Sequence, residues 1–178
     1  MFELFDAAQA LSGQPPMVGD GIAIVTNAGG MGVIATDYAG DLDLPLAELS
    51  KETLQEIGKV CPPTWSWENP IDIIGDADTA RYANVLRVVG QAQEVKGILV
   101  IAARQAATNL FEIAKWISIT AKLSGKPTVA CFAGIDDPES EQFLYGRGIP
   151  VMSVPERAIT ALSALSVRGK YLKKKGLI

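Results

Sequence analysis

Residues 22–38 read IAIVTNAGGMGVIATDY and give the clearest indication of the fold. The apolar run 22–26 is typical of a buried strand, and the pattern of residues 31–40 predicts a helix. The glycine-rich segment between them is a strand-to-helix turn, which points unpaired backbone N–H groups and the positive end of a helix dipole at one spot. Such a junction predicts an anion site, most often for phosphate, formed by Asn27, Ala28, Gly29, Gly30, Met31 and Gly32.

The residues of this glycine loop leave other interpretations open. Glycine can be present only because a tight turn needs it. The loop lacks the Lys-Ser/Thr pair of a P-loop, which argues against binding of a nucleoside triphosphate in that manner. Gly30, Gly32 and Ala35 match one form of the dinucleotide-binding fingerprint, and Glu48 stands where the ribose-binding acid is expected. A dinucleotide-binding domain is therefore an alternative.

Short apolar segments alternate with helical patterns along the rest of the chain. Strands are predicted at four further places: residues 71–74, 97–102, 127–133 and 149–152. Another is predicted at Leu44–Leu49, where Pro45 suits an edge position. This alternation predicts an α/β fold, with a mostly parallel sheet of about five strands and helices on both faces. Ligands of such sheets bind beyond the carboxyl ends of the strands, where we expect the glycine loop, Ser50 and the loops after the other strands.

The composition places the 178-residue chain among ordinary globular proteins. Because 48% of its residues are hydrophobic, 20% are charged and the net charge is −4, we expect neither disorder nor nucleic-acid binding. No apolar run reaches ~18 residues, so no membrane span is expected. Cys61 and Cys131 indicate neither a disulfide nor a zinc site, and the cytoplasm is the expected location. Residues 1–178 are predicted to form a single domain.

The chain contains no histidine. This excludes a Ser/His/Asp or Cys/His catalytic set, and no cluster of Cys and His is present to hold a metal. We therefore assign no catalytic residue and no metal-ligand set. Any chemistry that needs an imidazole must use a residue from another domain or subunit.

A second candidate site lies in residues 69–78, NPIDIIGDAD. Its polar groups could hydrogen-bond a ligand, coordinate a cation or form an interface. They suit turns and helix caps equally well, because Asn before Pro favours a turn and Asp is a common N-cap. Arg104 follows a predicted strand and could contact an anion. The candidate ligand or interface residues are Asn69, Asp72, Gly75, Asp76 and Arg104.

Two tryptophans, Trp65 and Trp67, flank Ser66 in a predicted loop. They could form a stacking platform or an interface patch. In the other interpretation, one is buried and the other covers the edge of the sheet.

Several segments, taken in order, resemble one family. They are Ile22–Gly32, Leu46–Ser50, Pro62-Pro63, Asn69–Asp72, Gly75–Ala77, Arg81-Tyr82, Gly148–Val151 and Pro155–Ala158. This set covers nearly the whole chain and resembles the third domain of the α-subunit region of ADP-forming (NDP-forming) acyl-CoA synthetases, which are relatives of succinyl-CoA synthetase. The resemblance implies a flavodoxin-like, three-layer domain of the succinyl-CoA synthetase type that forms one part of a larger enzyme.

The resemblance also implies a reaction in which acyl-CoA, ADP and phosphate give the free acid, CoA and ATP. A histidine on another domain would carry the phosphoryl group, and residues 27–32 would help to hold its phosphate. No cofactor would be tightly bound here, since other domains would bind CoA and ADP or ATP. The implied partners are a CoA-binding domain, a phosphohistidine-bearing domain and a nucleotide-grasp domain or subunit, in a hetero- or homo-oligomer.

An alternative role for the same module is a regulatory, catalytically silent part of a protein lysine acetyltransferase. In either role the chain is expected to be inactive alone, because it has no CoA-binding or nucleotide-grasp domain.

Overall fold

The computed structural model describes residues 2–178; Met1 lies outside it, and the side chain of Phe2 is not described. Residues 2–178 contain five strands: β1 (Ile22–Thr26), β2 (Ile71–Asp72), β3 (Gly97–Ala102), β4 (Thr128–Phe132) and β5 (Val151–Met152). The same residues contain seven helices: α1 (Phe2–Gly13), α2 (Gly29–Asp41), α3 (Lys51–Gly58), α4 (Thr79–Gln91), α5 (Leu110–Ser124), α6 (Pro138–Tyr145) and α7 (Pro155–Lys174).

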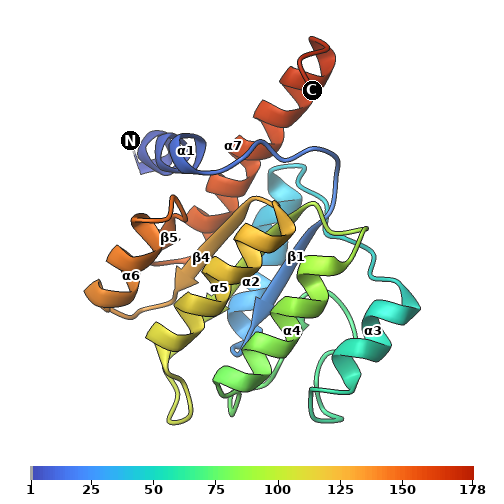
Figure 1. The fold of residues 1–178 in the computed structure, drawn as a ribbon, viewed down its shortest axis with the longest axis vertical. Helices are drawn as coiled ribbons and strands as arrows, with labels where there is room; N and C mark the ends of the chain where they lie inside the picture. The colour runs from blue at the N-terminus through green and yellow to red at the C-terminus, as the bar shows by residue number, and fades with distance from the viewer. Residues whose placement is uncertain (1) are drawn as a thin grey trace.

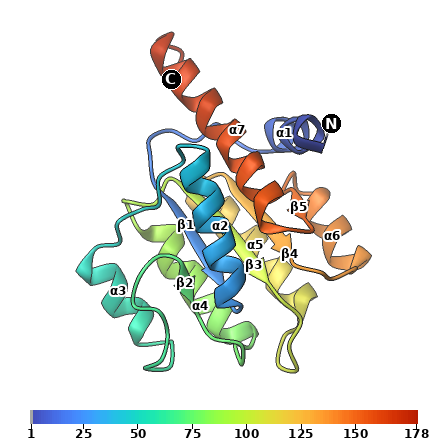
Figure 2. The ribbon, with the colours of Figure 1, turned by 180° about the vertical axis from the view of Figure 1, so that it is seen from behind.

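The strands form one parallel sheet in the order β2-β1-β3-β4-β5. This is the strand order of flavodoxin-like folds. Helices α4 and α5 cover one face, with α3 beside α4 and α6 beside α5; α2 and α7 cover the other face, and α1 packs on α7 (Figures 1 and 2). The predicted three-layer, flavodoxin-like α/β architecture with about five strands is confirmed.

The strands are apolar throughout because both faces of the sheet are covered. In β1, Ala23 and Val25 join the core beneath α4 and α5, whereas Ile22 and Ile24 join the core beneath α2 and α7. Every residue of β1, β3 and β4 is buried. Successive side chains of a strand point to opposite faces, so a doubly covered sheet needs an unbroken apolar run rather than alternation.

The predicted strand at Leu44–Leu49 is wrong, because this segment makes one isolated bridge, Leu46 with Ile22. Pro45 has no N–H to donate to a ladder. The side chain of Asn69 takes the adjacent positions: its Oδ1 accepts from the N–H of Ile24 (3.0 Å), and its Nδ2 donates to the carbonyls of Ile22 (2.8 Å) and Ala47 (3.1 Å). One amide side chain therefore replaces a strand pairing.

Ser50 was expected at the carboxyl end of the sheet, and this expectation is also wrong. Its N–H donates to the carboxylate of Glu94 (2.9 Å), which lies in the turn before β3. Ser50 therefore lies at the opposite, amino end. Its hydroxyl caps α3 by accepting from the N–H of Thr53 (3.1 Å).

Candidate site at the carboxyl edge of the sheet

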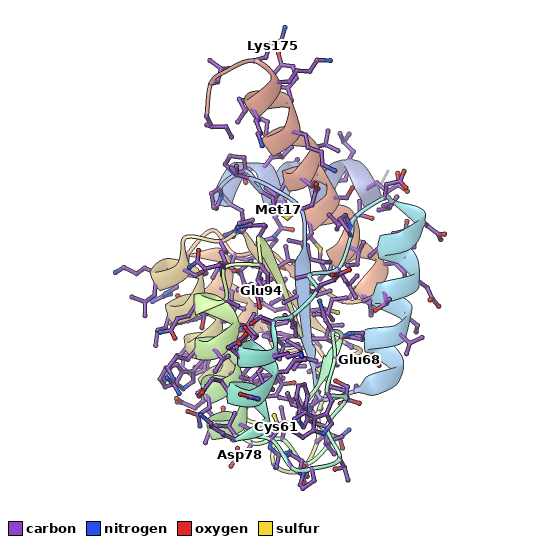
Figure 3. The ribbon with its side chains drawn as sticks, turned by 90° about the vertical axis from the view of Figure 1, so that its right-hand side faces the viewer. Met17, Cys61, Glu68, Asp78, Glu94 and Lys175 are labelled. Carbon is purple, nitrogen blue, oxygen red and sulfur yellow. The ribbon has the colours of Figure 1, made fainter. Side chains whose placement is uncertain are left out.

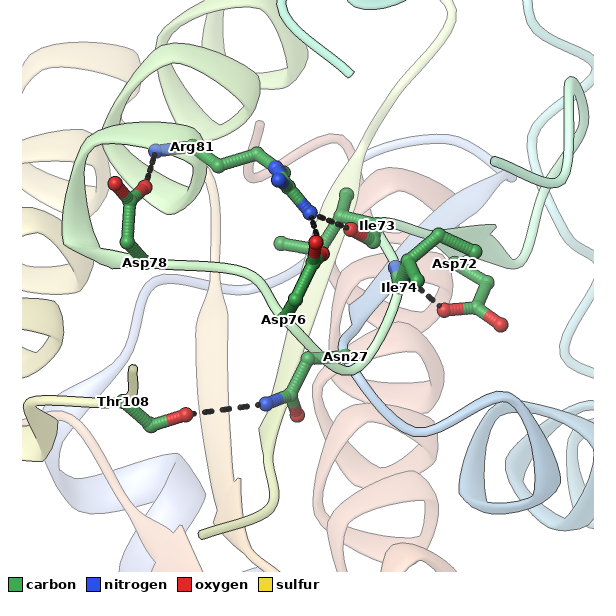
Figure 4. A network of polar contacts seen from close by, with 8 residues as sticks. All are labelled: Asn27, Asp72, Ile73, Ile74, Asp76, Asp78, Arg81 and Thr108. Atoms are coloured by element: carbon green, nitrogen blue, oxygen red, sulfur yellow. Dashed lines mark hydrogen bonds and ion pairs between the residues drawn. The ribbon is translucent and has the colours of Figure 1, made fainter. Parts of the chain in front are cut away.

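Strands β1 and β3 are neighbours, and their carboxyl ends meet where the chain turns to opposite sides of the sheet. In doubly wound folds this switch point is the usual ligand site. Asn27 follows β1 there, and it is only 2% exposed. Its Nδ2 donates to the carbonyl of Ala103 (2.9 Å), and its Oδ1 accepts from the N–H of Ala103 (2.8 Å). Asn27 Nδ2 also lies 3.4 Å from Thr108 Oγ1 (Figure 4), so this side chain joins two loops rather than facing a ligand.

The glycine loop begins α2 without a side-chain cap. Ala28 is the N-cap residue, and its carbonyl accepts from the N–H groups of Met31 (2.9 Å) and Gly32 (3.2 Å). Among the described residues, the N–H groups of Gly29 and Gly30 have no hydrogen-bond partner. The first turn of α2 also contains no acidic residue. Two free donors at the positive end of a helix dipole are suited to binding an anion.

The three glycines of the loop have different surroundings. A Cβ added at Gly29 would lie 2.5 Å from Oδ2 of Asp72, and one at Gly32 would lie 3.1 Å from Cγ2 of Thr26. A Cβ at Gly30 would meet nothing within 4 Å. Gly29 and Gly32 are therefore closely packed against neighbouring side chains, whereas Gly30 faces open space.

The segment after β2 lies beside this loop and is arranged mainly by turn and cap contacts (Figure 4). Oδ1 of Asp72 accepts from the N–H of Ile74 (2.9 Å), and Asp78 caps α4 by accepting from the N–H of Arg81 (2.8 Å). The guanidinium of Arg81 pairs with Asp76 and donates to the carbonyl of Ile73 (2.9 Å). The hydrogen bond from Arg81 holds the pKa of Asp76 below its usual value.

The candidates of residues 69–78 therefore separate into two groups. Asp72 and Asp76 reach the carboxyl edge, and Gly75 approaches the carbonyl of Asn27, to which an added Cβ would lie 3.7 Å away. Asn69 lies further back along β1, where its side chain bonds the backbone of β1 and of Ala47.

Arg104 lies in the loop after β3, where it lines a cavity of about 500 Å³. Asn109, the N-cap of α5, and the acidic residues Asp137 and Glu139 also line this cavity. Arg104 is therefore placed at the same edge as the glycine loop, but among acidic neighbours.

Tyr82 is a site residue that sequence reasoning missed. It is fully buried on α4, and its hydroxyl donates to the carbonyl of Ile101 (2.9 Å). Burial raises the pKa of Tyr82; a hydrogen bond with the backbone of Asn27 opposes this rise, and the charge of Asp72 adds to it. An aromatic residue on an apolar helix face gives no sequence signal for such a position beneath a loop.

The structure places Glu48, the candidate ribose-binding acid, away from the glycine loop. Two residues before it, Leu46 bridges to Ile22, the first residue of β1, and two residues after it, Ser50 bonds to Glu94. Glu48 therefore lies near the amino ends of the strands. In the view of Figure 3, Glu94 lies well away from Asp78, which begins α4 at the carboxyl edge. This geometry does not suit a dinucleotide site.

The two tryptophans adopt different environments, and one of them is buried, as the second interpretation expected. Trp65 is 2% exposed and Trp67 is 50% exposed, with ring centroids 5.0 Å apart. Both cysteines are free, and burial raises the pKa of Cys61 to about 11 and that of Cys131 to about 12, so both are thiols at neutral pH.

Within residues 2–178, no group of three or more acidic or cysteine side chains is arranged to hold a metal ion. None of the helices described is both long and apolar enough to cross a membrane.

Comparisons with known proteins identify the family of the chain. The chain is 38% identical to subunit alpha of acetate–CoA ligase [ADP-forming] I from Pyrococcus furiosus, over 97% of this chain and 38% of that subunit. It matches the apo form of the dinucleotide forming acetyl-coenzyme A synthetase 1 of Ca. Korarchaeum cryptofilum with a TM-score of 0.89 and 32% identity, over 100% of this chain and 40% of that one.

The structure of the same Korarchaeum protein in complex with phosphate and ADP matches with a TM-score of 0.88 and 32% identity, over 99% of this chain and 39% of that one. The chain thus spans about two fifths of the length of these relatives. The model of the Ligase-CoA domain family matches residues 22–173. The chain therefore belongs to the Ligase-CoA domain family.

Proposed function

We propose that this chain is the Ligase-CoA domain of an ADP-forming acyl-CoA synthetase, which converts acyl-CoA, ADP and phosphate to the acid, CoA and ATP. In this proposal the domain holds the phosphate of a phosphohistidine that another domain supplies. The observation that carries the proposal is the uncapped start of α2, with the N–H groups of Gly29 and Gly30 free at the switch point of the sheet. Support also comes from the similar Korarchaeum synthetase, which was crystallised with phosphate and ADP.

The chemistry assigned to this edge is electrostatic. The N–H groups of Gly29 and Gly30 donate to oxygens of the phosphoryl group, and the α2 dipole favours its negative charge. Because these donors are fixed by the helix, they need no rearrangement when charge moves during phosphoryl transfer. The loop takes no proton and forms no covalent bond, in keeping with a chain that has no histidine.

The remaining parts of the reaction belong to partners in this proposal. One domain binds CoA, another carries the reacting histidine, and a nucleotide-grasp domain or subunit binds ADP or ATP. The 178-residue chain forms a single domain of that assembly, which is a hetero- or homo-oligomer in the cytoplasm. The chain alone has no turnover and no tightly bound cofactor.

The test is Gly30→Asp in the assembled synthetase. A Cβ at this position meets nothing within 4 Å, so the domain is expected to fold normally. The new carboxylate would occupy the place of the phosphate, and we expect turnover to fall by about 100-fold or more. Gly40→Asp is the matched control, because Gly40 lies on the same helix and also has open space around it. Full activity of the Gly30→Asp enzyme would reject the phosphate role.

A further inference from the structure

One carboxylate lies against the start of α2. Asp72 ends β2 and pairs with Thr26, the last residue of β1. Its Oδ2 lies so close to Gly29 that a Cβ there would be 2.5 Å away. No donor among the described residues bonds to this oxygen. A fixed negative charge therefore adjoins the two free N–H groups at the start of α2.

The position of this carboxylate is set by several contacts. Oδ1 of Asp72 accepts from the N–H of Ile74 (2.9 Å), and the N–H of Asp72 donates to Oγ of Ser66 (3.0 Å). Ile74 has a φ of 71°, a left-handed conformation that is costly for a β-branched residue. The bond to Ser66 fixes the backbone of Asp72, and the bond from Ile74 holds its carboxylate, so the side chain does not swing freely away from α2.

Nearby cations do not neutralise this charge. Arg81 is engaged with Asp76 and with the carbonyl of Ile73. Arg104 lines a separate cavity that also contains Asp137 and Glu139. The charge of Asp72 also reaches beneath the loop, where it contributes to the raised pKa of Tyr82. The nearest formal charge to the glycine loop is therefore negative.

We propose that Asp72 weakens phosphate binding at the start of α2, so that the site holds a phosphoryl group tightly only while a partner's side chain tethers it there, and free phosphate binds weakly. This inference rests on the proposed function and adds a release step to it. A tether supplies a high effective concentration, which overcomes a modest like-charge repulsion. Once the tethered group withdraws, the same repulsion disfavours rebinding. Asp72 acts through its negative charge and forms no bond in the reaction.

The experiment compares phosphate affinities of the 178-residue chain and its Asp72→Asn variant. Asn keeps an oxygen for the N–H of Ile74 and removes only the charge. Asp72→Ser is a second variant that removes the charge with a smaller acceptor. Asp78→Asn is the matched control: it removes one charge from the same edge, and Asn still caps α4. Inorganic phosphate is titrated at constant ionic strength, and the amide resonances of Gly29 and Gly30 are followed by NMR.

We expect Asp72→Asn and Asp72→Ser to bind phosphate on the order of fivefold more tightly than the unmodified chain, with Asp78→Asn unchanged. A gain in affinity is an outcome that structural damage would not produce. If every protein binds phosphate equally, or if Asp78→Asn gains as much, the inference about Asp72 is overturned while the phosphate site stands. If no variant shifts the resonances of Gly29 and Gly30 even at high phosphate, both the inference and the proposed phosphate role fail.

Discussion

Helices α2 and α4 both begin at the carboxyl edge of the sheet, but their first turns differ. Asp78 caps α4 with a hydrogen bond to the N–H of Arg81 (2.8 Å), whereas Ala28 at the same position of α2 offers no side-chain oxygen. A cap at such a position contributes about 0.5–2 kcal/mol to stability. Among the described residues, the first two N–H groups are without a partner in both helices, but the α2 start lacks this cap and carries no carboxylate in its place, which is the arrangement expected where an external anion is bound.

The largest effect is expected when α2 is given a side-chain cap like that of α4. Ala28 has extended backbone angles (φ −137°, ψ 91°), which suit an N-cap residue, so Ala28→Asp places a carboxylate at the start of α2, within reach of the N–H of Gly30 or Met31. In the assembled synthetase we expect turnover to fall by about 100-fold, because the new negative charge repels the phosphoryl group and competes for its donors. In the chain alone, urea denaturation should show a gain of about 1 kcal/mol in the free energy of unfolding.

Together these two results would show that stability and phosphate chemistry compete at one place. Unchanged turnover in the Ala28→Asp enzyme would contradict a role for these donors. Loss of both stability and turnover would indicate misfolding instead, and Ala28→Ser then provides a neutral cap for comparison.

Substitutions at Gly29 and Gly30 test how the first turn of α2 is packed. Gly29→Ala should lower the free energy of unfolding by about 1–3 kcal/mol, because its Cβ would meet Oδ2 of Asp72 at 2.5 Å. Gly30→Ala should raise it by about 0.5–1 kcal/mol, because its Cβ enters open space and alanine favours a helix. Urea titration measures both. In an Asp72→Ala background the cost of Gly29→Ala should shrink; an undiminished cost would show that the strain has another source.

Removing the side-chain cap of α4 tests whether this helix contributes to stability alone or also to turnover. Asp78→Ala should lower the free energy of unfolding by about 1 kcal/mol, because the N–H of Arg81 loses its partner. Phosphate-dependent turnover of the assembled enzyme should change little. A large loss of turnover without loss of stability would mean that α4, too, takes part in binding the anion.

The smallest expected effect is a loss of stability at low pH. The pKa of Asp76 is lowered in the folded chain, chiefly by its hydrogen bond with Arg81, so its contribution to stability is present above the unfolded pKa and is lost as the pH falls through the folded value. Because Asp76 is exposed, the contribution is small. Amide hydrogen exchange in the first turn of α4 should accelerate slightly below about pH 4 relative to Asp76→Asn. Identical pH profiles for the two proteins would show that the pair adds nothing.

The sheet could be predicted from the sequence because its determinants are local. Ile22–Thr26 and Gly97–Ala102 are continuous apolar runs, and such runs alternating with helices require a doubly covered parallel sheet. Leu44–Leu49 misled the prediction because the group that replaces its pairing, the Asn69 side chain, lies 22 residues from Ala47. No periodic pattern encodes a side chain that takes the place of a strand.

The sequence predicted where the candidate site lies but not how its residues pack. Strand ends predicted that Asn27–Gly32, Gly75 and Asp76 lie at one edge, whereas Asp72 reaches this edge because β2 ends two residues earlier than predicted. The sequence did not separate Gly30, which faces open space, from Gly29, which contacts Asp72, because that difference depends on how two distant loops pack. Burial of Asn27 depends on Ala103, 76 residues away. Neither contact can be inferred from the order of residues along the chain.

The amide of Asn69 has a consequence for the integrity of the sheet. It accepts from the N–H of Ile24 and donates to the carbonyl of Ile22, between the bridge of Leu46 to Ile22 and the pairing of β2 with Val25. A buried backbone N–H without an acceptor costs about 1–3 kcal/mol. A substitution that removes this amide would therefore weaken β1 at its middle while its neighbours stay in place, so local opening of that strand is the defect to expect from it.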